Sequence, residues 1–283
     1  MHLDDVRQFY AEEIQAVANL KSKALARAFA KVPREHFLGP GPWQIASPDM
    51  VTGGVNYRVT EDDDPRHLYH NVLVAIDPAR NLNNGQPSTL AFFLDSLDLQ
   101  EGERVLHIGC GVGYYTAIIA ETVGPAGQVI GIEVDAELAE RARNNLADFS
   151  NVQALHGDGA TFDPGETDAI LINAGATHPR ALWLDSLRIG GRLLLPLTFS
   201  KEPEGTGSGL MLKVKREEES YAARFVSPVS IYPFIGVRDN QMNNKLREAM
   251  MRGTWATVRR LRRDPHEPSD TCWLHGSDFC LSA

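Results

Sequence analysis

Residues 104–115, with the sequence RVLHIGCGVGYY, contain the motif on which the fold assignment depends. Arg104 to Ile108 is a short apolar run typical of a buried strand, and the residues from Tyr115 onward have a helical composition. Between them lies the turn from Gly109 to Gly113, whose three glycines let a ligand approach the backbone closely. Free N–H groups at the start of the following helix favour an anionic group. From the glycine turn alone, the alternative is that these residues form only a structural corner between a strand and a helix and bind no ligand.

Predicted strands and helices alternate on either side of this motif. Further strands are expected at Val129–Glu133, Val152–Leu155, Ala169–Ile172 and, after a Gly190-Gly191 turn, Arg192–Leu197. Helices are expected at Pro87–Leu97, Tyr115–Val123, Ala136–Leu146 and Ala181–Leu187. Strands that are apolar on both faces indicate a parallel sheet covered on both sides. The sequence therefore predicts an α/β fold, a doubly wound Rossmann-like sheet whose ligand crevice lies beyond the carboxyl ends of the strands.

The flanking regions suggest three parts: a helical cap with a loop insertion (1–67), a central domain (68–235) and a C-terminal helix and tail (236–283). We expect one helix from Asp4 to about Ala30 and a long loop or an insertion from Gly39 to Arg66. A turn at Lys201–Gly209 should precede an antiparallel edge pair, Leu210–Val214 and Ala223–Val229. A helix is expected from Asn240 to Arg263, and the tail from Asp264 to Ala283 is unassigned.

Composition narrows the classes of partner. The net charge of −9 disfavours nucleic acid, and the basic run Arg259–Arg263 is interpreted as a solvated helix face. We find no secretory signal and no apolar run near the ~20 residues that span a bilayer. The three cysteines, Cys110, Cys272 and Cys280, fit a reducing compartment. A cytoplasmic protein with no membrane partner is therefore expected, and the oligomeric state is left open.

The residues after the glycine turn indicate which ligand it binds. Glu133 ends the next strand, where a carboxylate can accept hydrogen bonds from both hydroxyls of a ribose. The dinucleotide pattern G-x-G-x-x-G would need a glycine at Tyr114. The spacing present, G-x-G-x-G, suits a ligand with a small zwitterionic amino acid, so S-adenosyl-L-methionine is favoured over NAD. Asp158-Gly159, after the third strand, can accept a hydrogen bond from the adenine amine.

With these residues identified, the chain resembles the protein-L-isoaspartate O-methyltransferase family between Ala28 and Pro233. The motifs that carry the resemblance are residues 28–37 (AFAKVPREHF), 85–87 (GQP), 104–114, 157–159 (GDG), 167–172 and 190–196. The resemblance implies a class I S-adenosylmethionine-dependent methyltransferase. Its acceptor would be a carboxylate of a protein or peptide, typically the α-carboxyl of an isoaspartyl residue. Such a group is already an anionic nucleophile at neutral pH.

The resemblance also implies roles for individual residues. Gly109, Gly111 and Gly113 would line the methionine part, Glu133 the ribose, and Asp158 with Gly159 the adenine. His107, Cys110 and Asn173 complete the expected cofactor-binding set. The expected substrate-binding residues are Gly85, Gln86 and Pro87.

Two positions depart from the family pattern. Gly85 stands where the family usually has a serine associated with catalysis, so the catalytic residue is unknown and Asn84 and Ser88 are the candidates to replace it. His107 stands where an acidic residue is common and would favour the cofactor's ammonium group. The alternatives are therefore a tailoring methyltransferase with another peptide or small-molecule acceptor, a nucleotide-binding protein without activity, and an NAD-dependent oxidoreductase.

The C-terminal cysteines raise the question of a metal site. Cys272, His275 and Cys280 match no regular zinc spacing, and the sequence shows no evident fourth ligand. No metal is therefore expected.

Overall fold

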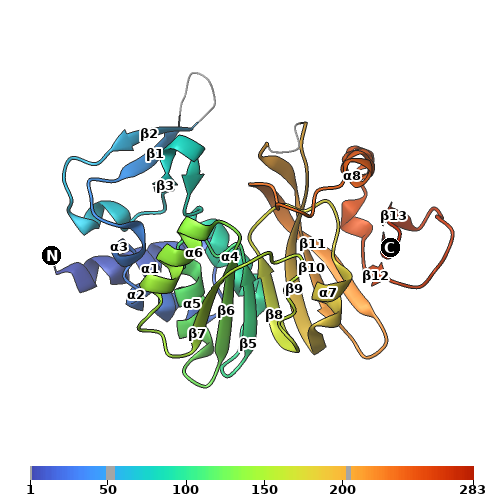
Figure 1. The fold of residues 1–283 in the computed structure, drawn as a ribbon, viewed down its shortest axis with the longest axis horizontal. Coiled ribbons are helices and arrows are strands. Elements are labelled where there is room, and N and C mark those ends of the chain that lie inside the picture. Colours follow the sequence, from blue (N-terminus) through green and yellow to red (C-terminus); the bar gives the residue numbers. More distant parts are fainter. Residues whose placement is uncertain (1, 49–54, 202–204) are drawn as a thin grey trace. The chain divides into compact units, whose positions relative to one another are not determined.

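The computed structural model describes residues 2–48, 55–201 and 205–283. Two compact units can be distinguished, and the chain passes between them several times (Figure 1). The first consists of Met1–Gly102, Cys110–Val129 and Asp135–Leu155. The second consists of Glu103–Gly109, Ile130–Val134 and His156–Ala283.

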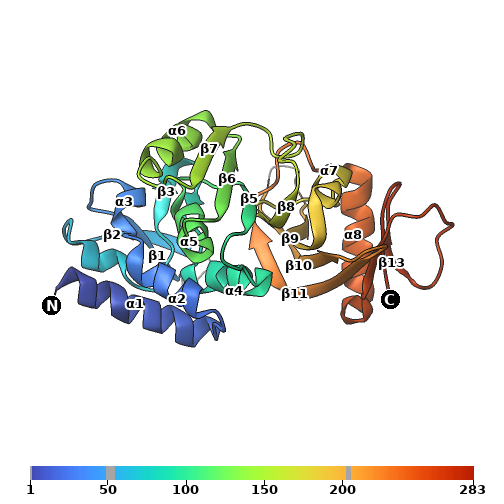
Figure 2. The same cartoon turned by 90° about the horizontal axis from the view of Figure 1, so that it is seen from below.

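The first unit begins with two helices, α1 (Leu3–Ala18) and α2 (Lys23–Lys31). The prediction of one continuous helix was wrong, because Asn19 adopts a left-handed conformation (φ 51°) that ends α1. Ser22 then caps α2, since its hydroxyl accepts a hydrogen bond from the Leu25 N–H at 3.2 Å. Figure 2 shows α1 and α2 in blue beside α4.

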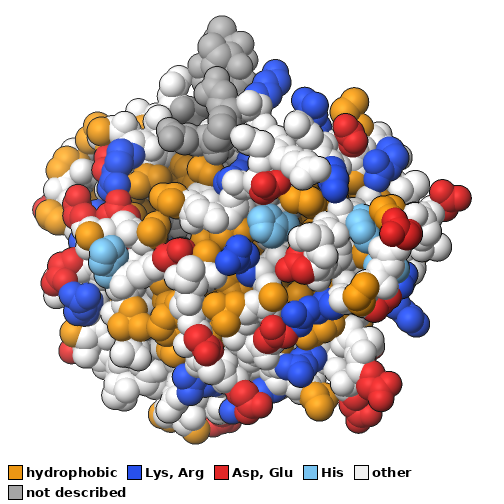
Figure 3. Space-filling view, turned by 45° about the vertical axis from the view of Figure 1, so that its right-hand side comes forward, with side chains coloured by type: hydrophobic (Ala, Val, Ile, Leu, Met, Phe, Trp, Pro, Cys, Tyr) orange, Lys and Arg blue, Asp and Glu red, His pale blue; other side chains and the backbone are white. Residues whose placement is uncertain are grey.

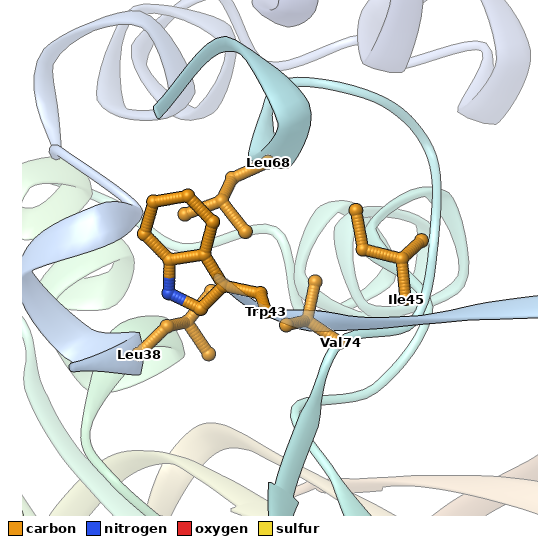
Figure 4. Close-up of a cluster of buried hydrophobic side chains, with 5 residues drawn as sticks. All are labelled: Leu38, Trp43, Ile45, Leu68 and Val74. Carbon is orange, nitrogen blue, oxygen red and sulfur yellow. The ribbon is translucent and has the colours of Figure 1, made fainter. Parts of the chain in front are cut away.

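A small hairpin follows the short helix α3 (Glu35–Leu38). Strands β1 (Gln44–Pro48) and β2 (Val55–Val59) pair antiparallel, so the prediction of a loop throughout 39–66 was wrong; its residues 49–54 lie outside the described residues. A buried apolar cluster explains why this region folds: Trp43 packs with Leu38, Ile45, Leu68 and Val74 (Figure 4). Short elements complete the region: η1 (Pro65–Leu68), β3 (Ala75–Asp77), η2 (Pro78–Arg80) and β4 (Leu82–Asn83).

Three helices of the first unit follow their predictions to within one residue. They are α4 (Pro87–Leu97), α5 (Tyr114–Val123) and α6 (Ala136–Asn145). Nine of the ten residues of α5 are buried, which is why its sequence is apolar all round. Helix α2 packs against α5.

The strands form a ten-stranded sheet with the order β13-β14-β12-β11-β10-β9-β8-β5-β6-β7. The predicted strands are β5 (Arg104–Ile108), β6 (Gln128–Glu133), β7 (Val152–His156), β8 (Thr167–Ile172) and β9 (Leu187–Phe199). β8 pairs in parallel with both β5 and β9, and the short helix α7 (Ala181–Asp185) connects β8 to β9. The prediction of a turn at Gly190-Gly191 was wrong, because both glycines belong to β9. Its pairing with β8 is interrupted between Leu187 and Arg192. The α/β fold class is confirmed.

The C-terminal half of the sheet is antiparallel. β10 (Gly207–Arg216) pairs with both β9 and β11 (Tyr221–Ile231), so the predicted pair exists but is not at the edge. The preceding turn was expected at Lys201–Gly209, of which residues 202–204 are outside the described residues. Three further strands extend the sheet. β12 (Arg260–Arg262) lies where a helix was predicted, and β13 (Cys272–His275) and β14 (Cys280–Ser282) come from the unassigned tail.

Helix α8 (Asn240–Arg252) is shorter than predicted. Gly253, with a φ of 71°, ends it, and a short η3 (Trp255–Thr257) leads into β12. The basic run is therefore not a helix face; Arg262 pairs with Asp264, and Arg263 pairs with Asp185. Acidic and basic side chains are interspersed on the face in Figure 3. Among the described residues, no helix has the length and apolar character needed to cross a membrane.

Candidate active site

The glycine turn adopts a backbone that only glycine tolerates well. Gly109, Gly111 and Gly113 have φ angles of 75°, 56° and 94°. A Cβ on Gly113 would lie 2.8 Å from Leu146 Cδ1, so this glycine allows α5 to start close to the end of α6. A Cβ on Gly111 would meet no described atom within 4 Å. A side chain at Gly111 would therefore point into open space, which is compatible with close approach by a ligand.

Gly109 belongs to the second unit, while Cys110 to Gly113 belong to the first. The Gly109 N–H donates to the Ile132 carbonyl of β6 at 2.8 Å, and a Cβ there would lie 3.3 Å from the Asn173 carbonyl oxygen. Asn173 follows β8, and its N–H donates to the Ile108 carbonyl at 2.8 Å. Cys110 is buried and free of disulfide bonding. The ends of β5, β6 and β8 thus meet around Gly109.

Two predicted carboxylates lie at the same edge of the second unit. Glu133, the last residue of β6, is 8% exposed, and its carbonyl accepts the Gly157 N–H at 2.9 Å. Asp158 is exposed, and its carboxylate accepts a hydrogen bond from the Ala160 N–H at 2.8 Å. Gly159 fits against β5, since a Cβ would lie 2.3 Å from Ile108 Cγ2. This edge, beyond the carboxyl ends of the strands, is where open α/β sheets bind ligands.

His107 lies inside β5 rather than on its exposed edge. It is fully buried, opposite Leu171 of β8. Burial lowers the pKa of His107 to about 3, so its imidazole is neutral at pH 7. A neutral ring lacks the negative charge that would attract an ammonium group. Where the resemblance leads us to expect an acidic residue, this chain therefore has a buried, uncharged imidazole.

The predicted substrate segment lies in the first unit and is held by hydrogen bonds. The Gln86 amide donates to the backbone carbonyl of Asn71 at 2.5 Å and to its side-chain oxygen at 2.9 Å. The Ser88 hydroxyl accepts a hydrogen bond from the Asn71 amide at 2.9 Å. Pro87 is buried at the first position of α4. Ser88 thus already serves to position this segment, and its catalytic role stays a prediction.

Asn84 is held in a similar way. Its side-chain oxygen accepts hydrogen bonds from Arg34 at 3.2 Å and from the Val74 N–H at 3.1 Å. Gly85 has a φ of 76°, and its carbonyl accepts a hydrogen bond from the Tyr115 hydroxyl at 3.2 Å. The sequence did not assign a role to Asn71 or Tyr115, because nothing in the local pattern indicates that they contact this segment.

Arg34 is the residue that organises this part of the first unit. It is fully buried, and its guanidinium donates to the carbonyls of Leu68 (2.5 Å), His70 (3.1 Å) and Val72 (2.7 Å) as well as to Asn84. It also lies 5.8 Å from the centre of the Tyr10 ring. A single side chain therefore fixes the loop that precedes Gly85.

A cavity of about 850 Å³ adjoins the Asp158 loop in the second unit. Ala160 and Thr161 line one part of it, and α8 contributes Lys245. Its other charged residues include Arg180 and Asp278, so the lining carries both signs of charge. This cavity could not be predicted from the sequence, because its walls come from segments more than 100 residues apart.

Comparison with known proteins is consistent with this geometry. Residues 63–236 match the model of the protein-L-isoaspartate(D-aspartate) O-methyltransferase family. The protein-L-isoaspartate O-methyltransferase of Ignicoccus hospitalis is 29% identical over 238 residues, 82% of this chain and 99% of that protein. The enzyme of the same name from Methanopyrus kandleri is 30% identical over 239 residues, 81% of this chain and 91% of that protein.

Solved structures agree at the level of the fold. A protein-L-isoaspartate O-methyltransferase structure superposes with a TM-score of 0.59 at 21% identity, over 87% of this chain and 69% of that one. A second, described as a putative member from Plasmodium falciparum in complex with S-adenosyl-L-homocysteine, gives a TM-score of 0.59 at 17% identity, over 81% and 97% of the two chains. The family match and the sequence relatives confirm the resemblance that the sequence motifs carry.

Proposed function

This chain belongs to the protein-L-isoaspartate(D-aspartate) O-methyltransferase family, and from that premise we propose that it methylates the α-carboxylate of isoaspartyl residues in proteins or peptides. It is an S-adenosylmethionine-dependent methyltransferase. The observation that carries the proposal is the glycine turn between β5 and α5, where Gly109, Gly111 and Gly113 all have positive φ angles. We assign the space beside this turn to the cofactor.

Backbone groups and two carboxylates of this chain would hold the cofactor. The backbone at Gly111 and the first N–H groups of α5 suit the carboxylate of its amino-acid part. Glu133 would accept the ribose hydroxyls, and the exposed Asp158 would accept the adenine amine. When bound, S-adenosylmethionine supplies an electrophilic methyl group.

The acceptor needs little acid–base assistance from this chain. A carboxylate with a pKa of about 3.9 is already deprotonated at pH 7 and loses no proton on methylation. The main task of the protein is therefore to orient the acceptor and exclude water, which can contribute several kcal/mol. The segment 84–88, fixed by Asn71 and Tyr115, would supply that orientation through its backbone.

The test is a methyl-transfer assay with the full chain and S-adenosylmethionine labelled in the methyl group. The acceptor is an isoaspartyl peptide, and its control is the same peptide with ordinary aspartate. We expect base-labile label in the isoaspartyl peptide alone. If neither peptide is labelled while the protein binds S-adenosylhomocysteine, the acceptor is a different one and the proposal is wrong in its substrate.

Gly85 favours one specific alternative, a tailoring methyltransferase with another acceptor. The structure refines how this can be tested, because position 85 has a φ of 76° and a Cβ there would lie 2.9 Å from Leu90 Cδ2. Any L-residue is therefore strained, by about 1–2 kcal/mol. Gly85→Ala has this strain without a hydroxyl, so it is the matched control for Gly85→Ser.

If isoaspartate is the acceptor, the serine variant should methylate the isoaspartyl peptide about 3- to 10-fold faster than the alanine variant, as expected for one hydrogen bond. Equal rates would show that a hydroxyl at position 85 does nothing for this substrate, and would favour the tailoring alternative.

A further inference from the structure

Four metal-binding side chains converge in the C-terminal part of the second unit. They are His266, Cys272, His275 and Cys280, and their ligand atoms all lie within 4.8 Å of one another. The sequence predicted no metal here, because Cys272, His275 and Cys280 match no regular zinc spacing. The fourth ligand, His266, was not evident because it precedes Cys272 by six residues in a segment without regular structure. None of the four lies in the part of the chain that matches the family model.

The strand pairing explains how these side chains meet. β13 and β14 are antiparallel, with His275 directly opposite Cys280. Cys272 is the first residue of β13. His266 lies in the segment before β13, and its ring contacts the His275 ring edge-on, with 4.9 Å between the ring centroids. Figures 1 and 2 both show β13 beside α8.

The hydrogen bonds around His266 leave one ring nitrogen facing the cluster. Its Nδ1 lies 2.8 Å from the Asp264 carbonyl oxygen. A carbonyl can only accept, so Nδ1 carries the proton and the lone pair is on Nε2. That Nε2 lies 3.5 Å from Cys272 Sγ. Histidines that bind metals commonly donate their second N–H to a carbonyl in this way.

His275 gives an independent indication of a ligand. Its Nδ1 is buried and makes no hydrogen bond with any described residue. A buried polar atom without a partner costs about 1–3 kcal/mol, so it calls for an explanation. The Cys272 thiol already accepts the Ser269 N–H at 3.4 Å, as a thiolate ligand would. A cation between these groups would satisfy the His275 nitrogen.

We propose that His266, Cys272, His275 and Cys280 form a structural zinc site. Two thiolates and two imidazoles are the ligand types that zinc prefers over magnesium or calcium. With Zn–S near 2.3 Å and Zn–N near 2.0 Å, tetrahedral ligand atoms are about 3.3–3.8 Å apart, which the 3.5 Å contact between His266 and Cys272 matches. Four protein ligands leave no open position for a substrate, so the site is structural.

The ion would stabilise a segment that has little apolar packing of its own. Residues 267–271 are all exposed, whereas Trp273 and Leu274 on β13 are buried. Zinc would tie His266, and with it this segment, to the strand pair. Zinc binds cysteine as the thiolate, so a thiol that is still protonated loses its proton when the ion binds.

The first test measures metal in the full-length chain, purified under reducing conditions in zinc-containing medium without a histidine tag. We expect about one zinc per chain by mass spectrometry of the metal, as a single four-ligand site requires. The variants Cys272→Ser, Cys280→Ser and His266→Ala should lose most of it. The matched controls, Cys110→Ser and His2→Ala, should retain it.

The second test does not depend on whether these variants fold. Replacing zinc by cobalt(II) in the unaltered chain should produce thiolate-to-cobalt charge transfer and the visible bands of tetrahedral cobalt. The proposal is overturned if the reduced, folded chain takes up neither metal, or if zinc persists in the Cys272→Ser/Cys280→Ser double variant. It is also overturned if intact mass shows that Cys272 and Cys280 form a disulfide in place of metal binding.

Discussion

Glu133 is the residue on which the expected affinity for the cofactor depends most. The variant Glu133→Gln removes the charge but keeps the shape, so the ribose hydroxyls lose a charged acceptor. Hydrogen bonds to charged groups contribute about 1.5–3 kcal/mol, and we expect S-adenosylhomocysteine to bind ~10- to 100-fold more weakly. Calorimetric titration measures this change.

The control for this prediction is Glu137→Gln, which alters an exposed carboxylate four residues further on, in the first turn of α6. Its affinity should stay within about twofold, since an exposed charge at this distance is screened. Equal affinities in the two variants would show that Glu133 does not contact the ligand.

His107 should make the protein sensitive to acid. Its pKa is about 3 in the fold, because burial disfavours the charged ring, and 6.5 in the unfolded chain. Between these values the unfolded state binds the extra proton. The contribution of the neutral His107 ring to the free energy of unfolding is therefore fully present above pH 6.5, and it is lost as the pH falls toward 3. The loss between pH 7.5 and pH 5 is about 2 kcal/mol.

Urea denaturation at both pH values measures this effect. His107→Asn should lose about 2 kcal/mol less than the unaltered chain over this interval. His2→Asn, which removes an exposed histidine, should behave like the unaltered chain. If His107→Asn shows the full loss, the acid sensitivity comes from other groups.

For single residues, the sequence predicts which residue stands at a strand end or a turn better than it predicts how deeply that residue is buried. The glycine turn and Glu133 could be assigned because their backbone conformation or strand end follows from local pattern. The burial of His107 could not, since it depends on β8 packing beside β5. The positive φ at Gly85 was equally hidden, because glycine is compatible with either sign of φ.

The loop before Gly85 depends on Arg34, which connects it to the segment between α2 and α3. The variant Arg34→Lys keeps the positive charge but cannot reach four acceptors with a planar fork. At least one buried carbonyl should lose its partner. We expect the free energy of unfolding to fall by about 2–3 kcal/mol, measured by urea denaturation.

Arg27→Lys is the control, because Arg27 is exposed on α2. It should change stability by less than about 0.5 kcal/mol. Hydrogen exchange gives a second readout: in Arg34→Lys the amides of residues 68–74 should exchange faster. Unchanged exchange there would mean that other contacts hold the loop.

Helices and strands of the central region were predicted to within a few residues, because their apolar residues recur with the period of a helix or form short strand-like runs. The errors fall where a single residue changes the backbone. Asn19 divides the N-terminal helix, and Gly253 ends α8 well before Arg263. The β1–β2 hairpin escaped notice because its short strands show little apolar alternation. Its stability comes from the cluster around Trp43.

On the scale of the whole chain, the sequence predicts the α/β class but not how far the sheet extends. β5 to β9 follow from alternating strands and helices. β12, β13 and β14 are three or four residues long, and their pairing joins segments up to 40 residues apart, from Tyr221 to Leu261. Local pattern does not encode such contacts. The same long-range folding brings His266 to the two cysteines.

The proposed zinc site makes the thermal stability of the whole chain depend on metal. A ligand that binds only the folded state, present at 100 times its Kd, stabilises that state by about 2.7 kcal/mol. For a chain of this size, 1,10-phenanthroline should therefore lower the Tm by about 5–10 °C, and added zinc should restore it. The isomer 1,7-phenanthroline, which does not chelate, should have no effect. Cys110→Ser should show the same shift, whereas the Cys272→Ser/Cys280→Ser variant should already melt at the lower temperature and not respond. A similar response in the double variant would mean that the chelator acts elsewhere, because the ligands it competes with would be gone.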